Sequence, residues 1–115
     1  MLTAVTDATF AAVVLANPKP VAVDFWAEWC PSCPRMTRAL ENLAAEVGDD
    51  LVAVTVNVDE NPQVTRAYRV LSMPTVLLFR AGGVTATVVG AKPPSALRRL
   101  LLGEREPYAN DENRA

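Results

Sequence analysis

The cysteines are the residues of this sequence best suited to chemistry. There are two, Cys30 and Cys33, separated by Pro31 and Ser32. Such a pair can exchange electrons with other thiols and disulfides, because a thiolate attacks a disulfide to form a mixed disulfide that a second thiol resolves. The sequence contains no histidine, which excludes Ser-His and Cys-His catalysis and His-ligated metal sites. Chemistry at neutral pH must therefore come from Cys, Asp, Glu, Tyr, Lys or the backbone.

Three other uses of the two cysteines compete with redox exchange. A structural disulfide across so short a loop would stabilise the fold by only about 2 kcal/mol on chain-entropy grounds. A structural zinc ion needs four ligands, and two thiols supply them only if the site is shared between chains. The cysteines could also be two small core residues, although the neighbouring Trp29 and two prolines make this less natural. The spacing and the context favour redox chemistry over all three.

The elements predicted around the cysteine pair place it at the start of a helix. Residues 21–26 are strand formers with few polar breaks, a run typical of a strand covered on both faces. A loop at residues 28–34 leads into a helix that ends at Gly48 and has its apolar face at Met36, Leu40, Leu43, Ala44 and Val47. A helix N-terminus carries unpaired N–H groups and the positive end of the dipole, which favour a thiolate. We therefore expect the Cys30 sulfur to accept from the N–H of Ser32 or Cys33.

The remaining segments alternate between helices and strands. Thr6 or Asp7 can cap a first helix, which ends at Asn17-Pro18. Residues 51–58 predict a second buried strand, and Asn61-Pro62 starts another helix.

The last third of the sequence predicts a hairpin and a final helix. Residues 75–79 and 84–89 are the hairpin strands, joined by a glycine-bearing turn. The final helix opens at residues 93–95 and has its apolar face at Leu97, Leu100 and Leu101. The order of elements predicts a three-layer α/β fold with a mixed sheet, parallel in its first half and antiparallel after the hairpin.

Length and charge limit the classes of partner. The chain has 115 residues and a net charge of −2, which suits one domain, here residues 1–103. Residues 1–102 carry nine basic and nine acidic side chains, so the acidic excess lies in residues 104–115, where we expect a polar, flexible tail. Nucleic acids and membranes are not expected partners, because there is neither a basic stripe nor an apolar run of about 20 residues. No Lys or Arg precedes Lys19, so a signal peptide is not indicated and a cytoplasmic location is expected.

The stretch Val23-Asp24-Phe25-Trp26-Ala27-Glu28-Trp29-Cys30-x-x-Cys33 closely resembles the active-site segment of thioredoxins, a well-known example of this motif. Further matches follow in the family's order and at its spacings, from about Val5 to Leu102: Val5-Thr6-Asp7 with Phe10, Asn57-Val58-Asp59, Asn61-Pro62, Met73-Pro74-Thr75 and Val89-Gly90-Ala91. The resemblance implies the thioredoxin fold, a three-layer α/β/α domain with a central mixed five-stranded sheet. It also implies a thiol–disulfide oxidoreductase that reduces disulfides in other proteins.

The resemblance further implies roles for single residues. Cys30 matches the nucleophilic cysteine and Cys33 the resolving one. Asp24 matches a buried carboxylate that moves a proton to or from the resolving thiol. Pro74 matches a cis-proline facing the disulfide, although most X-Pro bonds are trans. The rim that receives the substrate chain is expected at Trp29, Pro31, Met73, Gly90 and Ala91.

The residues give separate support for a buried Asp24. It lies within an apolar strand run, where desolvation would raise the pKa of the carboxyl group. The alternative is a solvated position at an edge or turn.

Three positions depart from the family's pattern. Pro31-Ser32 stands where typical thioredoxins have Gly-Pro, Thr55 where many carry a lysine near the buried carboxylate, and Arg38 where a proline kinks the helix. Because Thr55 is uncharged, we expect Asp24 to lack a charge partner. The Ser32 N–H and hydroxyl should favour the Cys30 thiolate and make the disulfide more oxidising than that of a Pro31→Gly/Ser32→Pro variant.

The implied partners are disulfide-containing client proteins and a thioredoxin reductase that uses flavin and NADPH. The chain itself is expected to bind no cofactor and no metal and to be a monomer. A thiol oxidase or disulfide isomerase of the same fold is one alternative function. A non-catalytic adaptor with the thioredoxin shape is the other.

Overall fold

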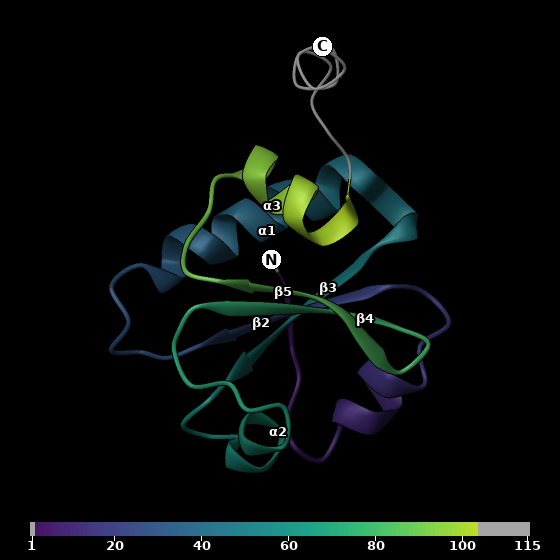
Figure 1. Ribbon diagram of the computed structural model, residues 1–115. Coiled ribbons are helices and arrows are strands. Elements are labelled where there is room, and N and C mark those ends of the chain that lie inside the picture. Colours follow the sequence, from purple (N-terminus) through teal and green to yellow (C-terminus); the bar gives the residue numbers. More distant parts are fainter. Residues whose placement is uncertain (1, 104–115) are drawn as a thin grey trace, which may run out of the picture.

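A five-stranded mixed sheet organises the molecule, whose computed structural model describes residues 2–103 (Figure 1). The strands are β1 (Thr3–Ala4), β2 (Val21–Trp26), β3 (Val52–Asn57), β4 (Thr75–Arg80) and β5 (Gly83–Val89). Their order is β1-β3-β2-β4-β5; β1, β3 and β2 are parallel, and β4 is antiparallel to both of its neighbours. The predicted fold is confirmed. The tail predicted at residues 104–115 lies outside the described residues.

Helices cover both faces of this sheet. Figure 1 shows α1 (Cys33–Val47) and α3 (Pro94–Leu102) on one face, and the π-helical turn η1 (Ala11–Leu15) with α2 (Pro62–Ala67) on the other. A 3-10 turn, η2 (Gly48–Asp50), connects α1 to β3. In the described part of the chain, no helix has the length and apolar character needed to cross a membrane.

The central strand β2 explains the apolar run of the sequence, because it is buried on both sides. Val23 and Phe25 pack into the core on the η1 and α2 side, and Ala22 packs into the core on the α1 and α3 side. Successive side chains of a strand point to opposite faces. Asp24 therefore shares a face with Ala22 and lies under α1.

Helix α1 is continuous through Arg38, the position of the family's kink proline. Met36, Leu40 and Leu43 are its fully buried apolar side chains, as predicted. Pro34 lies in the first turn, where a missing N–H costs no helical hydrogen bond. Helix α1 therefore begins at Cys33, directly after the loop that carries Cys30.

The predicted hairpin is confirmed. Ala81 and Gly82 connect β4 to β5, and both have positive φ, 50° and 81°. This is the backbone of a two-residue turn whose twist matches that of the strands.

Two details of the predicted helices are wrong. Leu100 does not belong to the buried face of α3: it is 44% exposed, whereas Leu97 and Leu101 are buried. Residues four apart share a helix face, and Leu100 lies about 100° around the helix from Leu101.

The other wrong detail concerns Asp7, which does not cap the first helical segment. Its carboxylate accepts from the N–H groups of Gln63 (3.2 Å) and Val64 (2.8 Å), in the first turn of α2. Only Thr6 acts locally, with its hydroxyl accepting from the Thr9 N–H at 3.3 Å. The prediction considered only residues close to Asp7 in the sequence, whereas Gln63 and Val64 reach it through the packing of α2.

Candidate redox site

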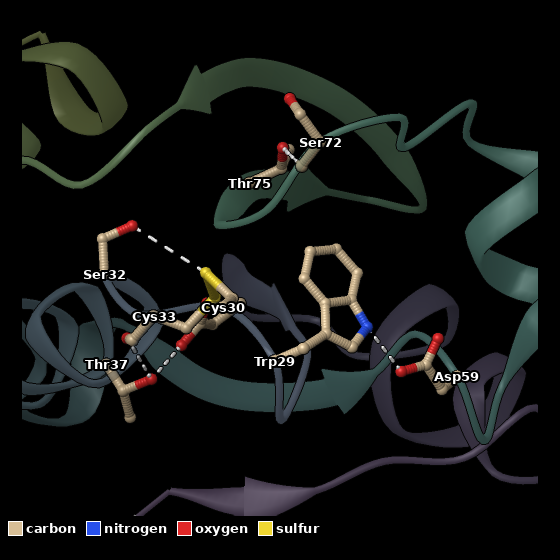
Figure 2. Close-up of a disulfide and its surroundings, with 9 residues drawn as sticks. Trp29, Cys30, Ser32, Cys33, Thr37, Asp59, Ser72 and Thr75 are labelled. Atoms are coloured by element: carbon tan, nitrogen blue, oxygen red, sulfur yellow. Dashed lines mark hydrogen bonds between the residues drawn. A yellow bond between two sulfur atoms is a disulfide. The ribbon is translucent and has the colours of Figure 1, made fainter.

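Cys30 and Cys33 form a disulfide where the loop after β2 enters α1, with their Cα atoms 5.4 Å apart (Figure 2). The loop is tightly turned, because the Cys30 N–H donates to the Ala27 carbonyl (3.2 Å) and the Cys33 N–H to the Cys30 carbonyl (3.3 Å). The two residues are buried, with 5% and 2% of their surface exposed. The predicted pairing is confirmed, and in this form neither sulfur is available to a zinc ion.

Ser32 approaches the cysteine expected to react first. Its hydroxyl lies 3.8 Å from the Cys30 sulfur (Figure 2). The expected backbone N–H bond to this sulfur concerns the thiolate form and stays a prediction.

Asp24 is fully buried beneath the first turns of α1, so the solvated alternative is wrong. The Thr37 hydroxyl donates to Asp24 Oδ2 at 2.6 Å, and its oxygen also lies 3.1 Å from the carbonyl oxygen of Cys33. The other carboxylate oxygen, Oδ1, has no hydrogen-bond partner among residues 2–103. Burial raises the pKa of Asp24 from 3.8 to about 6, and the Thr37 hydrogen bond acts in the opposite direction.

An uncharged residue occupies the position of the family's lysine near Asp24. Thr55 lies directly opposite Asp24 on β3, and no Lys or Arg of the described residues forms an ion pair with this carboxyl group. The sequence did not reveal Thr37 as the partner instead. Its spacing of four from Cys33, one helical turn, is the signal that could have found it.

An open cavity of about 470 Å³ lies beside the disulfide. Cys30, Cys33, Thr37 and Thr55 are among its lining residues. Thr37 therefore contacts both this cavity and the buried carboxyl group, and it connects the two.

A second part of the predicted site comes from β4 and β5. The Met73–Pro74 peptide bond is cis. Thr75 pairs with Phe25 near the end of β2, and the Gly90 N–H donates to the Pro74 carbonyl at 2.9 Å. This register brings Pro74 and Gly90 to the end of the sheet from which the redox loop departs.

Trp29 projects from the redox loop with 62% of its surface exposed. Its indole N–H donates to Asp59 Oδ2 at 2.9 Å, which fixes one edge of the ring and leaves a face open (Figure 2). Asp59 follows β3, and no pattern in the sequence pairs it with Trp29. An indole anchored by its polar edge suits a contact surface.

Two exposed apolar residues near this end of the sheet were not predicted as part of the site. Leu71 is 90% exposed and Val89 is 55% exposed, and both line an open depression of about 460 Å³ with Ser72 and Thr75. Their signal in the sequence is weak, since a single apolar residue outside a periodic pattern is common on protein surfaces.

Thiol–disulfide exchange is the chemistry open to a cysteine pair that can close into a disulfide at a helix N-terminus over a buried acid. By class, the domain is a dithiol–disulfide oxidoreductase. The family model named Thioredoxin matches residues 1–102. The chain belongs to the thioredoxin family, and its activity is the reduction of disulfides through the Cys30–Cys33 pair.

Individual relatives agree with this assignment. The chain is 46% identical over 97 residues to the thioredoxin of Mycobacterium tuberculosis (strain H37Rv), and the match covers 84% of each protein. It is 47% identical over 100 residues to the thioredoxin of Mycolicibacterium smegmatis, covering 85% of this chain and 89% of the relative. It is also 45% identical over 97 residues to the bifunctional thioredoxin reductase/thioredoxin of Mycobacterium leprae, covering 84% of this chain and 21% of the relative.

Proposed function

We propose that Cys30 attacks client disulfides and that Cys33 resolves the mixed disulfide. The Cys30 thiolate bonds to one client sulfur, the client S–S bond breaks, and the other client sulfur leaves as a thiolate that takes up a proton. Cys33 then loses its proton and attacks Cys30, which releases the second client thiol and closes the Cys30–Cys33 disulfide. Two electrons pass from the dithiol to the client. The observation that carries these roles is the position of Cys30 on the loop and of Cys33 inside the first turn of α1.

Asp24 is proposed to accept the proton of Cys33. With a pKa raised to about 6 by burial, its carboxyl group changes protonation close to neutral pH, as an efficient general base does. Thr37 supports this role, because its hydroxyl contacts both Asp24 and the Cys33 carbonyl.

The client chain is proposed to lie across the end of the sheet beside the disulfide. Trp29, Pro31, Met73, Gly90 and Ala91 would contact it, and Pro74 would face the reacting sulfurs. The exposed faces of Trp29 and Val89 support an apolar contact there.

The oxidised protein must be reduced again to act repeatedly. We propose that a reductase with flavin and NADPH supplies the electrons to a monomer of this chain, which holds no cofactor itself and uses residues 1–103 as its domain. One relative is named as a thioredoxin reductase joined to a thioredoxin. A cytoplasmic location fits this cycle, since that compartment keeps thiols reduced.

Trapping experiments test the cysteine roles. Cys33→Ala should accumulate mixed disulfides with client proteins, because nothing resolves them, and Cys30→Ala should accumulate few. The Cys30→Ala/Cys33→Ala double variant sets the background. Equal trapping by the two single variants would refute the assignment.

Two further measurements separate the alternative functions. The reduction potential of the Cys30–Cys33 pair, determined against glutathione, should lie near or below that of the glutathione pool; a value well above it would indicate an oxidase. A Cys30→Ser variant that kept full biological activity would indicate the adaptor.

A further inference from the structure

A surface with three cations leads away from the redox loop. One depression extends from Pro31 and Ser32 to Arg35 and Arg38. A second, of about 550 Å³, extends from the same two arginines to Ala91 and Lys92. Because the two share Arg35 and Arg38, they form one continuous surface, here called the basic groove. No Asp or Glu side chain lines either depression, although Arg38 also lines the cavity beside the disulfide, together with Glu28 and Glu41.

The three cations are available to a ligand. Arg35 and Arg38 are exposed and Lys92 is half-buried, and none of them forms an ion pair with residues 2–103. Arg98 differs, since it binds Glu46 at 2.8 Å. The Lys92 Nζ lies 3.8 Å from the position that a Cβ atom on Gly90 would occupy. The ammonium group therefore lies against the corner at which we place the client chain.

The other side of the redox loop carries the opposite charge. Asp59 and Glu60 are exposed there, and Asp59 holds the Trp29 indole. Residues 1–102 have equal numbers of basic and acidic side chains. The basic groove therefore results from a local separation of charge, and not from an excess of basic residues in the domain. A client segment crossing the disulfide meets cations on one side and carboxylates on the other.

We propose that the basic groove binds Asp or Glu side chains of client proteins close to the disulfide that is reduced, and so selects acidic clients. Arg35 and Arg38 follow Cys33 by two and five residues, which is about 3 and 7.5 Å along the helix axis. An extended client chain advances about 3.3 Å per residue, so carboxylates within about four residues of the client cysteine can reach these guanidinium groups. Arginine matches a carboxylate with two parallel hydrogen bonds, and complementary charge speeds encounter. This inference rests on the proposed function, because it concerns clients of the same cysteine pair.

Three matched peptides test the proposal with the full-length chain. Each carries one disulfide, and they differ only in having Glu, Gln or Lys at three positions beside the cysteine. The wild type should reduce the Glu peptide about tenfold faster than the Lys peptide in kcat/KM at low salt. This ratio should fall to about twofold or less in 1 M salt, where charges are screened beyond about 3 Å. Equal rates for the two peptides would overturn the proposal.

A pair of charge-reversal variants locates the effect. Arg35→Glu/Lys92→Glu should invert the preference between the Glu and Lys peptides. Lys19→Glu/Arg80→Glu changes the net charge equally at the opposite end of the sheet, where Val21 pairs with Phe79, and should keep the wild-type preference. If both variants changed the preference alike, net charge and not the basic groove would select clients, and the proposal would be wrong.

The Gln peptide separates this proposal from the proposed function. The preference is a ratio of rates within each variant, so a general loss of activity cancels. If the wild type reduced the Gln peptide and showed no preference, only the acidic-client proposal would fail. If it reduced none of the three, the proposed function would fail.

Discussion

Replacing Thr37 with valine tests how the buried carboxyl group is controlled. Valine has nearly the shape of threonine but lacks the hydroxyl that donates to Asp24 Oδ2 at 2.6 Å. Asp24 Oδ1 already has no partner among the described residues, so in the variant Oδ2 loses its donor and neither carboxylate oxygen has one among them. The pKa of Asp24, raised to about 6 by burial, should therefore rise further in Thr37→Val.

The size of this rise follows from the bond that is lost. A hydrogen bond to a charged group stabilises it by roughly 1.5–3 kcal/mol, and one pKa unit corresponds to about 1.4 kcal/mol. The loss therefore amounts to about one to two units. Water in the adjoining cavity, which Thr37 also lines, replaces part of the bond and places the expected shift near the lower value. The charged side chains lining that cavity, Glu28, Arg38 and Glu41, are the same in wild type and variants and do not affect the difference.

Thr37→Ser is the matched control, because it keeps the hydroxyl. A protonated Asp24 can donate to the hydroxyl oxygen while the hydroxyl donates to the Cys33 carbonyl, 3.1 Å away in the wild type. Serine preserves both arrangements and valine neither. A merely structural role for Thr37 would make the two variants alike.

The assay is an NMR titration of the Asp24 carboxyl carbon in the reduced protein, paired with the pH dependence of single-turnover disulfide reduction. Thr37→Val should move both midpoints up by about one unit, and Thr37→Ser should return them to within a few tenths of the wild type. An unshifted midpoint in Thr37→Val would refute the argument. A serine variant that behaved like the valine variant would refute it as well.

Three further predictions concern stability and potential. The native pKa of Asp24, about 6, exceeds its ordinary value of 3.8, so the unfolded chain loses this proton first as pH rises. The free energy of unfolding of the wild type should therefore fall by about 3 kcal/mol between pH 3.8 and pH 6 and stay lower above that range. Asp24→Asn should abolish that decline in denaturant series from pH 4 to 8, and parallel profiles would contradict it. Ser32→Ala removes the hydroxyl 3.8 Å from the Cys30 sulfur. The loss of one hydrogen bond to the thiolate, about 1.4 kcal/mol, should lower the reduction potential of the Cys30–Cys33 pair by about 30 mV. Equilibration with glutathione measures this potential, and an unchanged value would contradict the prediction. Asp7→Ala leaves two N–H groups of α2 without their acceptor and should lower the free energy of unfolding in urea by about 1–2 kcal/mol. Glu60→Ala is the exposed control. If both variants lost equally little stability, the Asp7 cap would contribute little.

The parts of the site that the sequence predicts are those determined by local pattern. The apolar run around Asp24 identified a strand buried on both faces, and burial of its carboxyl group followed. The two-residue spacing of Cys30 and Cys33 at a helix start likewise determined that the two sulfurs meet.

The parts that the sequence did not predict are contacts between separate elements. Asp7 binds the start of α2, 56 and 57 positions away, and Asp59 holds Trp29 across 30 positions. Thr37 reaches Asp24 over 13 positions. Each contact depends on how the elements pack against one another, and neither periodicity nor propensity contains that information.

A departure from the family's pattern indicates which side chain is missing near Asp24, but not which side chain contacts Asp24 in its place. Thr55 stands in place of the family's lysine, but this departure did not indicate which group contacts Asp24 instead. The replacement is a neutral hydroxyl on the same helical turn as Cys33. A neutral donor inside the fold is not screened by salt, whereas the exposed cations of the basic groove are. Raising the ionic strength should therefore leave the pKa of Asp24 nearly unchanged while it removes the preference for acidic clients. One salt series can thus separate proton transfer from client selection, although Thr37 and Arg38 line the same cavity.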